Sequence, residues 1–130
     1  MAGSAKRVVA VVDDDQRVLE SLEDLLESAG YAVRPYPSAE RLLEYDAGLA
    51  DLDCLISDIG LPVMDGFELR RLAKAKRPGL PVILITGRHE LSNLAGAEND
   101  RADGFFQKPI NSSDLLTAIS KALGASPRNK

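Results

Sequence analysis

The 130-residue sequence contains a single cysteine, Cys54, so it cannot form an internal disulfide bond. Long hydrophobic runs are absent as well. The longest apolar runs, residues 8–12 and 80–85, are far too short to span a membrane. Residues 1–7 are too short and too polar for a secretory signal. These absences together lead us to expect a protein of the reducing cytoplasm, without a membrane association.

Basic residues are also fewer than acidic residues. The 16 Lys and Arg residues are scattered along the chain and are outnumbered by 20 Asp and Glu residues, which gives a net charge of −4. An acidic balance without a basic stripe argues against direct nucleic-acid binding by this segment. Neither internal repeats nor low-complexity tracts occur, and the 45% hydrophobic and 28% charged residues are typical of one ordinary globular domain.

What the sequence does contain is a regular alternation of strand and helix patterns. Short apolar segments predict strands at residues 8–12, 31–36, 54–57, 81–85 and 104–107. Apolar residues at helical spacing predict helices over 18–29, from Ser38 to near Gly48, over 67–73, over 91–97, and from Ser112 or Ser113 to Leu123. The helix over 91–97 is expected to be short or mobile because Gly96 lies inside it. Right-handed β-α-β connections then imply an α/β fold, a parallel sheet with helices on both faces.

Polar residues stand where these predicted strands end, which is the edge at which open α/β sheets bind ligands. They are Asp13-Asp14-Asp15, Asp58, Thr86 and Lys108. Two carboxylates about 5 Å apart repel by roughly 3 kcal/mol at an effective dielectric near 20, so three carboxylates need a cation or shifted pKa values. Oxygen ligands of this kind suit Mg²⁺. An ionised aspartate beside Mg²⁺ and a lysine is a workable nucleophile toward phosphorus, giving an acyl phosphate.

Five short motifs, in this order and at these separations, carry a resemblance to a known family. They are Val12-Asp13-Asp14, Ser57-Asp58 followed by Pro62, Asp65-Gly66, Ile85-Thr86-Gly87 and Lys108-Pro109. Over about residues 7–123 the chain resembles the receiver domain of two-component response regulators, most closely the nitrogen-fixation regulator subclass. The resemblance implies a doubly wound, flavodoxin-like fold of five parallel strands in the order 2-1-3-4-5 with five helices. It places the receiver domain at residues 7–124, between a disordered N-terminus (1–6) and a tail or linker (125–130).

The resemblance also implies a role for each residue at the sheet edge. Asp58 would be the phosphoacceptor, taking a phosphoryl group from the phosphohistidine of a histidine kinase or a histidine phosphotransfer protein. The Mg²⁺ ligands would be Asp58, Asp14 directly, Asp13 largely through water, and the backbone carbonyl of Gly60. Thr86 would hydrogen-bond the phosphoryl group and Lys108 would pair with it, with Lys108-Pro109 joined by a cis bond. Thr86 and Phe105 would form the switch that controls a partner or output domain.

On this interpretation the protein is a signalling switch rather than an enzyme, and it catalyses only its own phosphorylation and dephosphorylation. Two features depart from the family pattern. Gly60 replaces the polar or basic residue often found two positions after the phosphoacceptor, which predicts an unusual phosphate lifetime. The segment Arg88–Asp103 lacks the apolar helical face of the surface used for phosphorylation-dependent pairing, so the mode of dimerisation is left open.

Plainer interpretations stand beside these roles. Asp58 and Thr86 could simply end their strands, and Asp15 is better explained as a solvated carboxylate or a helix N-cap than as a ligand. Phe105 and Phe106 should face opposite sides of their strand, and either could be an ordinary packed aromatic. Cys54 is expected to be a packed strand residue, and the single histidine, His89, a surface loop residue.

Two other functions compete with the phosphorylation switch. One is a small Mg²⁺-dependent phosphohydrolase of the haloacid dehalogenase type, in which Asp13 would be the nucleophile and Asp15 the acid/base. That interpretation leaves Asp58 without a function, and the sequence has no cap insert that would enclose a substrate. The other is an interaction module that keeps the fold but has lost phosphorylation, against which the retained carboxylates argue.

Overall fold

A single parallel sheet forms the centre of the molecule. The structure, a computed structural model, describes residues 6–45, 49–87 and 104–124. The strands of the sheet are β1 (Val8–Val12), β2 (Ala32–Tyr36), β3 (Cys54–Asp58), β4 (Val82–Thr86) and β5 (Gly104–Gln107). All neighbours are parallel, and their order is β2-β1-β3-β4-β5. Both the five predicted strands and the strand order implied by the family resemblance are confirmed.

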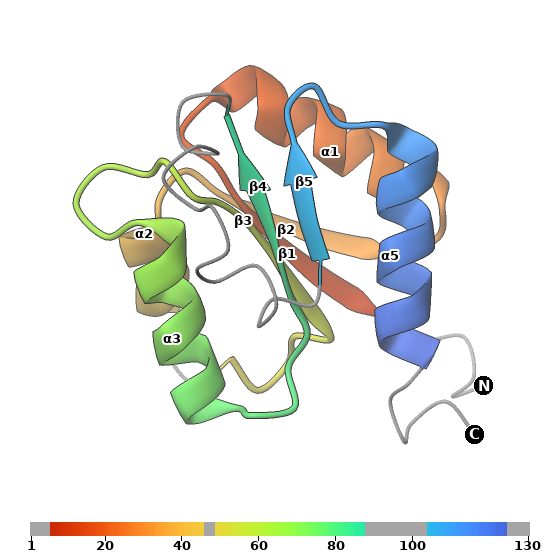
Figure 1. The fold of residues 1–130 in the computed structure, drawn as a ribbon. Coiled ribbons are helices and arrows are strands. Elements are labelled where there is room, and N and C mark those ends of the chain that lie inside the picture. Colours follow the sequence, from red (N-terminus) through yellow and green to blue (C-terminus); the bar gives the residue numbers. More distant parts are fainter. Residues whose placement is uncertain (1–5, 46–48, 88–103, 125–130) are drawn as a thin grey trace.

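Helices cover both faces of this sheet (Figure 1). The described helices are α1 (Gln16–Ser28), α2 (Ala39–Tyr45), α3 (Gly66–Lys76) and α5 (Ser112–Gly124). Apolar residues of α1 and α5 pack on one face, and those of α2 and α3 pack on the other. Four of the five predicted helices are thus observed, and the one predicted over 91–97 lies outside the described residues. None of the described helices combines the length and the apolar character that crossing a membrane requires.

The continuous apolar runs of the strands follow from this two-sided covering. In β1, Val9 and Val11 pack toward α1 and α5, whereas Ala10 and Val12 pack toward α2 and α3. A strand with both faces buried has no polar side and therefore does not alternate. The two edge strands are less buried. β2 carries the exposed Pro35, as its sequence predicts, and β5 is only half-buried.

The helix ends show which predicted caps are correct. Asp15 is the N-cap of α1, and Ser38 accepts a hydrogen bond from the backbone N–H of Arg41 at the start of α2. Gly30, after the C-terminal end of α1, has a φ of 98°. The predicted cap of the last helix is wrong. Asn111, rather than Ser112 or Ser113, accepts from a first-turn backbone N–H, at 2.9 Å. The side-chain amide oxygen of Asn111 caps the first turn of α5 as a serine hydroxyl would, from a position one residue earlier in the chain.

Candidate functional site

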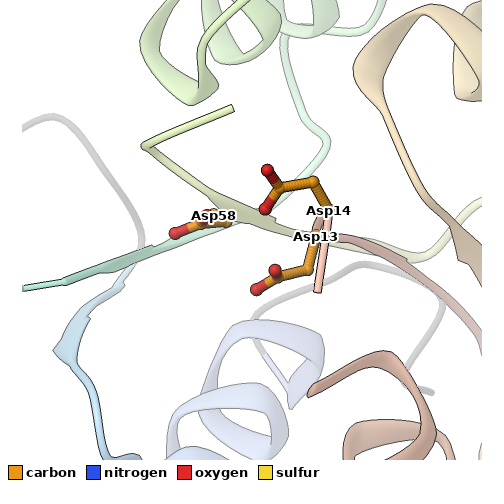
Figure 2. A group of neighbouring side chains, drawn as sticks. All are labelled: Asp13, Asp14 and Asp58. Carbon is orange, nitrogen blue, oxygen red and sulfur yellow. The ribbon is translucent and has the colours of Figure 1, made fainter. Parts of the chain in front are cut away.

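Three carboxylates gather at the carboxyl ends of β1 and β3. Asp13 and Asp14 follow β1 directly, and Asp58 is the last residue of β3. One oxygen from each lies within 4.8 Å of the others, and Figure 2 shows the three side chains projecting into the same region. Asp13 and Asp58 are buried, whereas Asp14 is exposed. We call these three residues the acidic cluster. The structure thus brings together the carboxylates that the sequence predicted to meet.

A lysine from the end of β5 neutralises part of this charge. The amine of Lys108 lies 3.2 Å from Oδ2 of Asp13 and 3.5 Å from Oδ1 of Asp58. The fully buried Oδ2 of Asp13 has no hydrogen-bond partner of good geometry, so we describe its contact with Lys108 as an ion pair. Lys108 is held in place by its backbone, whose N–H donates to the carbonyl of Thr86 at 2.9 Å.

The pKa values show that this concentration of charge is costly. Burial raises the pKa of Asp58 to about 6, and the negative charge of Asp13 adds to the effect. Lys108 and the backbone N–H of Gly60, which donates to the Asp58 carboxylate, offset only part of it. Burial likewise raises the pKa of Asp13. For Lys108 burial lowers the pKa, but the two carboxylates outweigh burial and the net pKa is raised, so the amine stays protonated.

The acidic cluster has the properties of a cation site. Every side-chain donor is a carboxylate oxygen, and the buried Oδ2 of Asp13 has no hydrogen-bond donor. One lysine cannot balance three carboxylates, and hard oxygen donors suit a divalent cation such as Mg²⁺ or Ca²⁺. The residues therefore fit a divalent cation. Gly60, whose carbonyl is the fourth predicted ligand, lies two residues after Asp58 in the loop that follows β3.

Thr86 and Phe105 stand on the two strands beside this cluster. Thr86 is the last residue of β4 and is buried, and its hydroxyl donates to the carbonyl of Gly87 at 2.9 Å. Phe105 is half-buried on the α3 side, with its ring centroid 6.4 Å from that of Phe67, whereas Phe106 packs on the opposite face. The prediction that the two phenylalanines face opposite ways is confirmed. The switch roles of Thr86 and Phe105 stay predictions.

Asp15 and Cys54 are not part of the acidic cluster. Asp15 accepts a hydrogen bond from the backbone of Arg17 at 2.9 Å as the N-cap of α1, which confirms the plainer interpretation. Cys54 is fully buried in β3, as expected of a packed strand residue. His89 lies outside the described residues. The bond between Lys108 and Pro109 is cis, as the resemblance implied.

Two features of the site were not predicted from the sequence. The first is a groove of about 450 Å³ beside Lys108, lined by one face of α1 and by residues 108–110 and Ser112. Its lining mixes apolar and polar side chains from segments that are far apart in the sequence, so no single stretch signals it. The second is the contact of Gly66 with the backbone of Asp58. The Asp65-Gly66 pair is visible in the sequence, but nothing in the sequence says what the glycine touches.

Comparison with known proteins agrees with this geometry. The profile of the family described as "Response regulator receiver domain" matches residues 9–120. The response regulator protein TmoT of Ectopseudomonas mendocina is 37% identical over 123 residues, which cover 95% of this chain and 56% of that protein. The transcriptional regulatory protein FixJ of Azorhizobium caulinodans is 36% identical over 119 residues, which cover 91% of this chain and 56% of that protein. The chain thus spans about half the length of the curated relatives it matches.

A solved structure shows the same architecture. The CheY-like response regulator receiver domain protein of Methanospirillum hungatei superposes with a TM-score of 0.84 at 32% identity, covering 97% of this chain and 100% of that one. Neither the family match nor these relatives support the phosphohydrolase alternative. Because the family profile matches most of the chain and these relatives share its sequence and fold, the protein belongs to the response regulator receiver domains, the signalling switches of two-component systems.

Proposed function

We propose that this receiver domain accepts a phosphoryl group on Asp58 from the phosphohistidine of a sensor histidine kinase or a histidine phosphotransfer protein. The observation that carries the proposal is the position of the Asp58 carboxylate, which lies within 4.8 Å of the other two carboxylates of the acidic cluster and 3.5 Å from the Lys108 amine. With a pKa of about 6, Asp58 is mostly ionised at neutral pH and is available as a nucleophile.

In the proposed transfer, an oxygen of Asp58 forms a bond to phosphorus while the phosphorus–nitrogen bond of the donor breaks. The electron pair of that bond returns to the imidazole of the donor. The amine of Lys108, already paired with Asp58, would stay paired with the negative charge of the transferred group. The proton on Lys108 is not given up, because the neighbouring carboxylates raise its pKa.

The proposed cofactor is Mg²⁺, held by Asp13, Asp14, Asp58 and the backbone carbonyl of Gly60. When bound, the cation would neutralise the charge that gathers on the phosphoryl oxygens during transfer. Asp13 supports this assignment because its buried Oδ2, although ion-paired with Lys108, has no hydrogen-bond partner and could accept from a metal-bound water. Asp14 supports it because an exposed carboxylate can bind a cation directly from solvent.

The proposed switch begins at Thr86. Its hydroxyl, which donates to Gly87, would turn to donate to the phosphoryl group and would draw the end of β4 with it. Phe105, on the next strand, would then change its packing against Phe67. A phosphoryl group adds charge and acceptor oxygens, which is enough to bias such a two-state arrangement. Gly60 at its position after Asp58 would give the phosphorylated state an unusual lifetime.

The rest of the proposal concerns the whole protein. Residues 7–124 would form the receiver unit, and residues 1–5 and 125–130, expected to lie outside that unit, are not among the described residues. An effector domain or separate partner would read the switch, and the name of the transcriptional regulatory protein FixJ suggests control of transcription as one output. This segment would act in the cytoplasm without binding nucleic acid or membrane itself, and a phosphorylation-dependent dimer is left open.

The decisive experiment is intact-mass measurement after incubation with acetyl phosphate and Mg²⁺. The wild type should gain the mass of one phosphoryl group, and Asp58→Asn should gain none. Asp24→Asn is the matched control because it removes an exposed carboxylate of α1 that is not part of the acidic cluster, and it should label normally. Equal labelling of Asp58→Asn would refute the assignment of the phosphoacceptor. A wild type that neither labels nor binds Mg²⁺ would instead favour an interaction module.

A further inference from the structure

The loop between β3 and α3 (residues 59–65) is tied down at both ends. Where it leaves the sheet, the N–H of Ile59 donates to the carbonyl of Ile85 at 2.8 Å. Where it returns, the N–H of Gly66 donates to the carbonyl of Ile59 at 3.0 Å. The loop therefore closes on itself next to Asp58. Inside it, the N–H of Gly60 donates to the Asp58 carboxylate.

Gly66 allows this closure because it has no side chain. A Cβ at this position would lie 2.5 Å from the carbonyl oxygen of Asp58, 2.7 Å from Cα of Ile59 and 3.0 Å from the carbonyl carbon of Asp58. These are backbone atoms, which cannot turn aside as a flexible side chain would. The φ of Gly66 is not in the left-handed region, so an alanine would be conformationally allowed. The space, rather than the backbone conformation, requires glycine here.

The loop is held by its anchors and by two of its own side chains, since Leu61 is buried in the core and Met64 packs against that core. Val63 has a φ of 67° and its side chain is 94% exposed. A β-branched residue is strongly disfavoured at positive φ, and such a conformation persists only where the surroundings over-determine it. No packing holds this exposed side chain in place. The constraint on Val63 therefore comes from its neighbours: the backbone closure at Ile59 and Gly66, and the packing of Leu61 and Met64.

We propose that Gly66 is a positioning residue for phosphoryl acceptance, because it lets α3 begin in direct contact with the Asp58 backbone and so fixes the loop that places the Gly60 N–H on the Asp58 carboxylate. The inference rests on the proposed phosphorylation of Asp58. A side chain at Gly66 displaces the peptide that carries the nucleophile, and displacements of about 1 Å reduce rates by up to about a hundredfold.

The test compares three glycine-to-alanine variants of the whole chain. Gly66→Ala should lower the initial rate of labelling by acetyl phosphate and Mg²⁺ at least about tenfold per folded molecule. Its Gly60 amide proton should also move upfield in the NMR spectrum of the unphosphorylated protein, because the hydrogen bond to the carboxylate is lost. Gly79→Ala is the neutral control, since nothing lies within 4 Å of the added Cβ.

Gly104→Ala is the control for general destabilisation. Its Cβ would lie 3.3 Å from the side chain of Ile83, at the amino end of β5 and therefore away from the acidic cluster. We expect it to lose stability but to keep its labelling rate per folded molecule and its Gly60 amide shift. If Gly104→Ala loses as much rate as Gly66→Ala, or if Gly66→Ala changes neither readout, the proposed role of Gly66 is overturned.

A second pair of variants decides the question if Gly66→Ala does not fold. Asp65→Ala removes the N-cap of α3, whose carboxylate accepts from the N–H of Glu68 at 2.9 Å, and adds no atom near Asp58. Ser38→Ala removes the equivalent cap of α2. Only Asp65→Ala should shift the Gly60 amide signal. If that signal does not move in Asp65→Ala, the proposed positioning of the loop by the start of α3, and with it the role of Gly66, is refuted. If the wild type itself is not labelled, the proposed function is refuted. The test of Gly66 still stands in that case, because the amide shift is measured without labelling.

Discussion

Replacing Asp58 with asparagine keeps the shape of the side chain but removes one negative charge from the acidic cluster. In the metal-free protein the pKa of Asp58 is raised from 3.8 to about 6, first by burial and then by the charge of Asp13. The folded state therefore disfavours the ionised carboxylate relative to the unfolded state. We expect metal-free Asp58→Asn to be more stable than the wild type at neutral pH.

The size of the effect follows from the shift. A difference of about two pKa units corresponds to about 3 kcal/mol of unfolding free energy at neutral pH, where Asp58 is ionised in both states. As the pH falls through about 6, the folded state binds a proton before the unfolded state does, and the wild type recovers stability. The recovery is complete only below the unfolded pKa of 3.8. The advantage of the variant should shrink by about 1.4 kcal/mol between about pH 7.5 and pH 5.

Urea unfolding followed by circular dichroism in EDTA at these two pH values measures the difference. Asp24→Asn, which removes an exposed charge, should show no comparable pH-dependent gain. Added Mg²⁺ should stabilise the wild type more than Asp58→Asn, because a cation that binds the folded state raises its stability. If the variant is no more stable than the wild type in EDTA, or if the gap does not change with pH, the electrostatic account of the acidic cluster is wrong.

Three further substitutions test individual contacts. Lys108→Met removes the amine that pairs with Asp58, so the pKa of Asp58 should rise further above about 6. An NMR titration of the Asp58 carboxyl carbon measures this pKa, and an unchanged value would contradict the ion pair. Arg77→Ala removes a guanidinium that donates to two backbone carbonyls of the α2–β3 connection, at 2.5 and 2.6 Å. The variant should lower the unfolding free energy by about 2–3 kcal/mol, and phosphoryl labelling per folded molecule should not change. Val63→Gly relieves a β-branched residue at positive φ, so urea unfolding should show a gain of about 1 kcal/mol, and a loss would contradict the strain.

Much of the fold was predictable because the apolar pattern of each segment matches the burial of that segment in the structure. Strands buried on both faces appear as unbroken apolar runs, and β1 and β4 were recognisable from five or six residues each. The strand order was not readable from the residues, since parallel strands leave no local record of their neighbours, and it came from the family resemblance. The cap of α5 was misassigned because Asn111, Ser112 and Ser113 are three adjacent residues that can all cap a helix.

The acidic cluster was predictable for a topological reason. A parallel sheet brings its carboxyl ends to one edge, so residues that follow different strands meet there without any sequence proximity. Gly66 could not be interpreted the same way. Its importance depends on the space beside it, where an added Cβ would lie only 2.5 Å from the carbonyl oxygen of Asp58. A helix start that contains glycine looks the same in sequence whether or not that space is filled. Spacing predicts which residues meet, but not how closely two backbones approach.

The charge of the acidic cluster links cation binding to phosphorylation. Within the described residues, Lys108 ion-pairs with Asp13 and Asp58, so one amine faces the three carboxylates of the acidic cluster and an excess of negative charge remains after pairing. A phosphoryl group on Asp58 would increase this excess, since phosphate carries more negative charge than the carboxylate it replaces. The cation should then bind more tightly to the phosphorylated protein, and by linkage the cation should favour phosphorylation by the same factor. Mg²⁺ titration of the two forms measures this coupling, and equal affinities would mean that the excess charge is balanced by some other group.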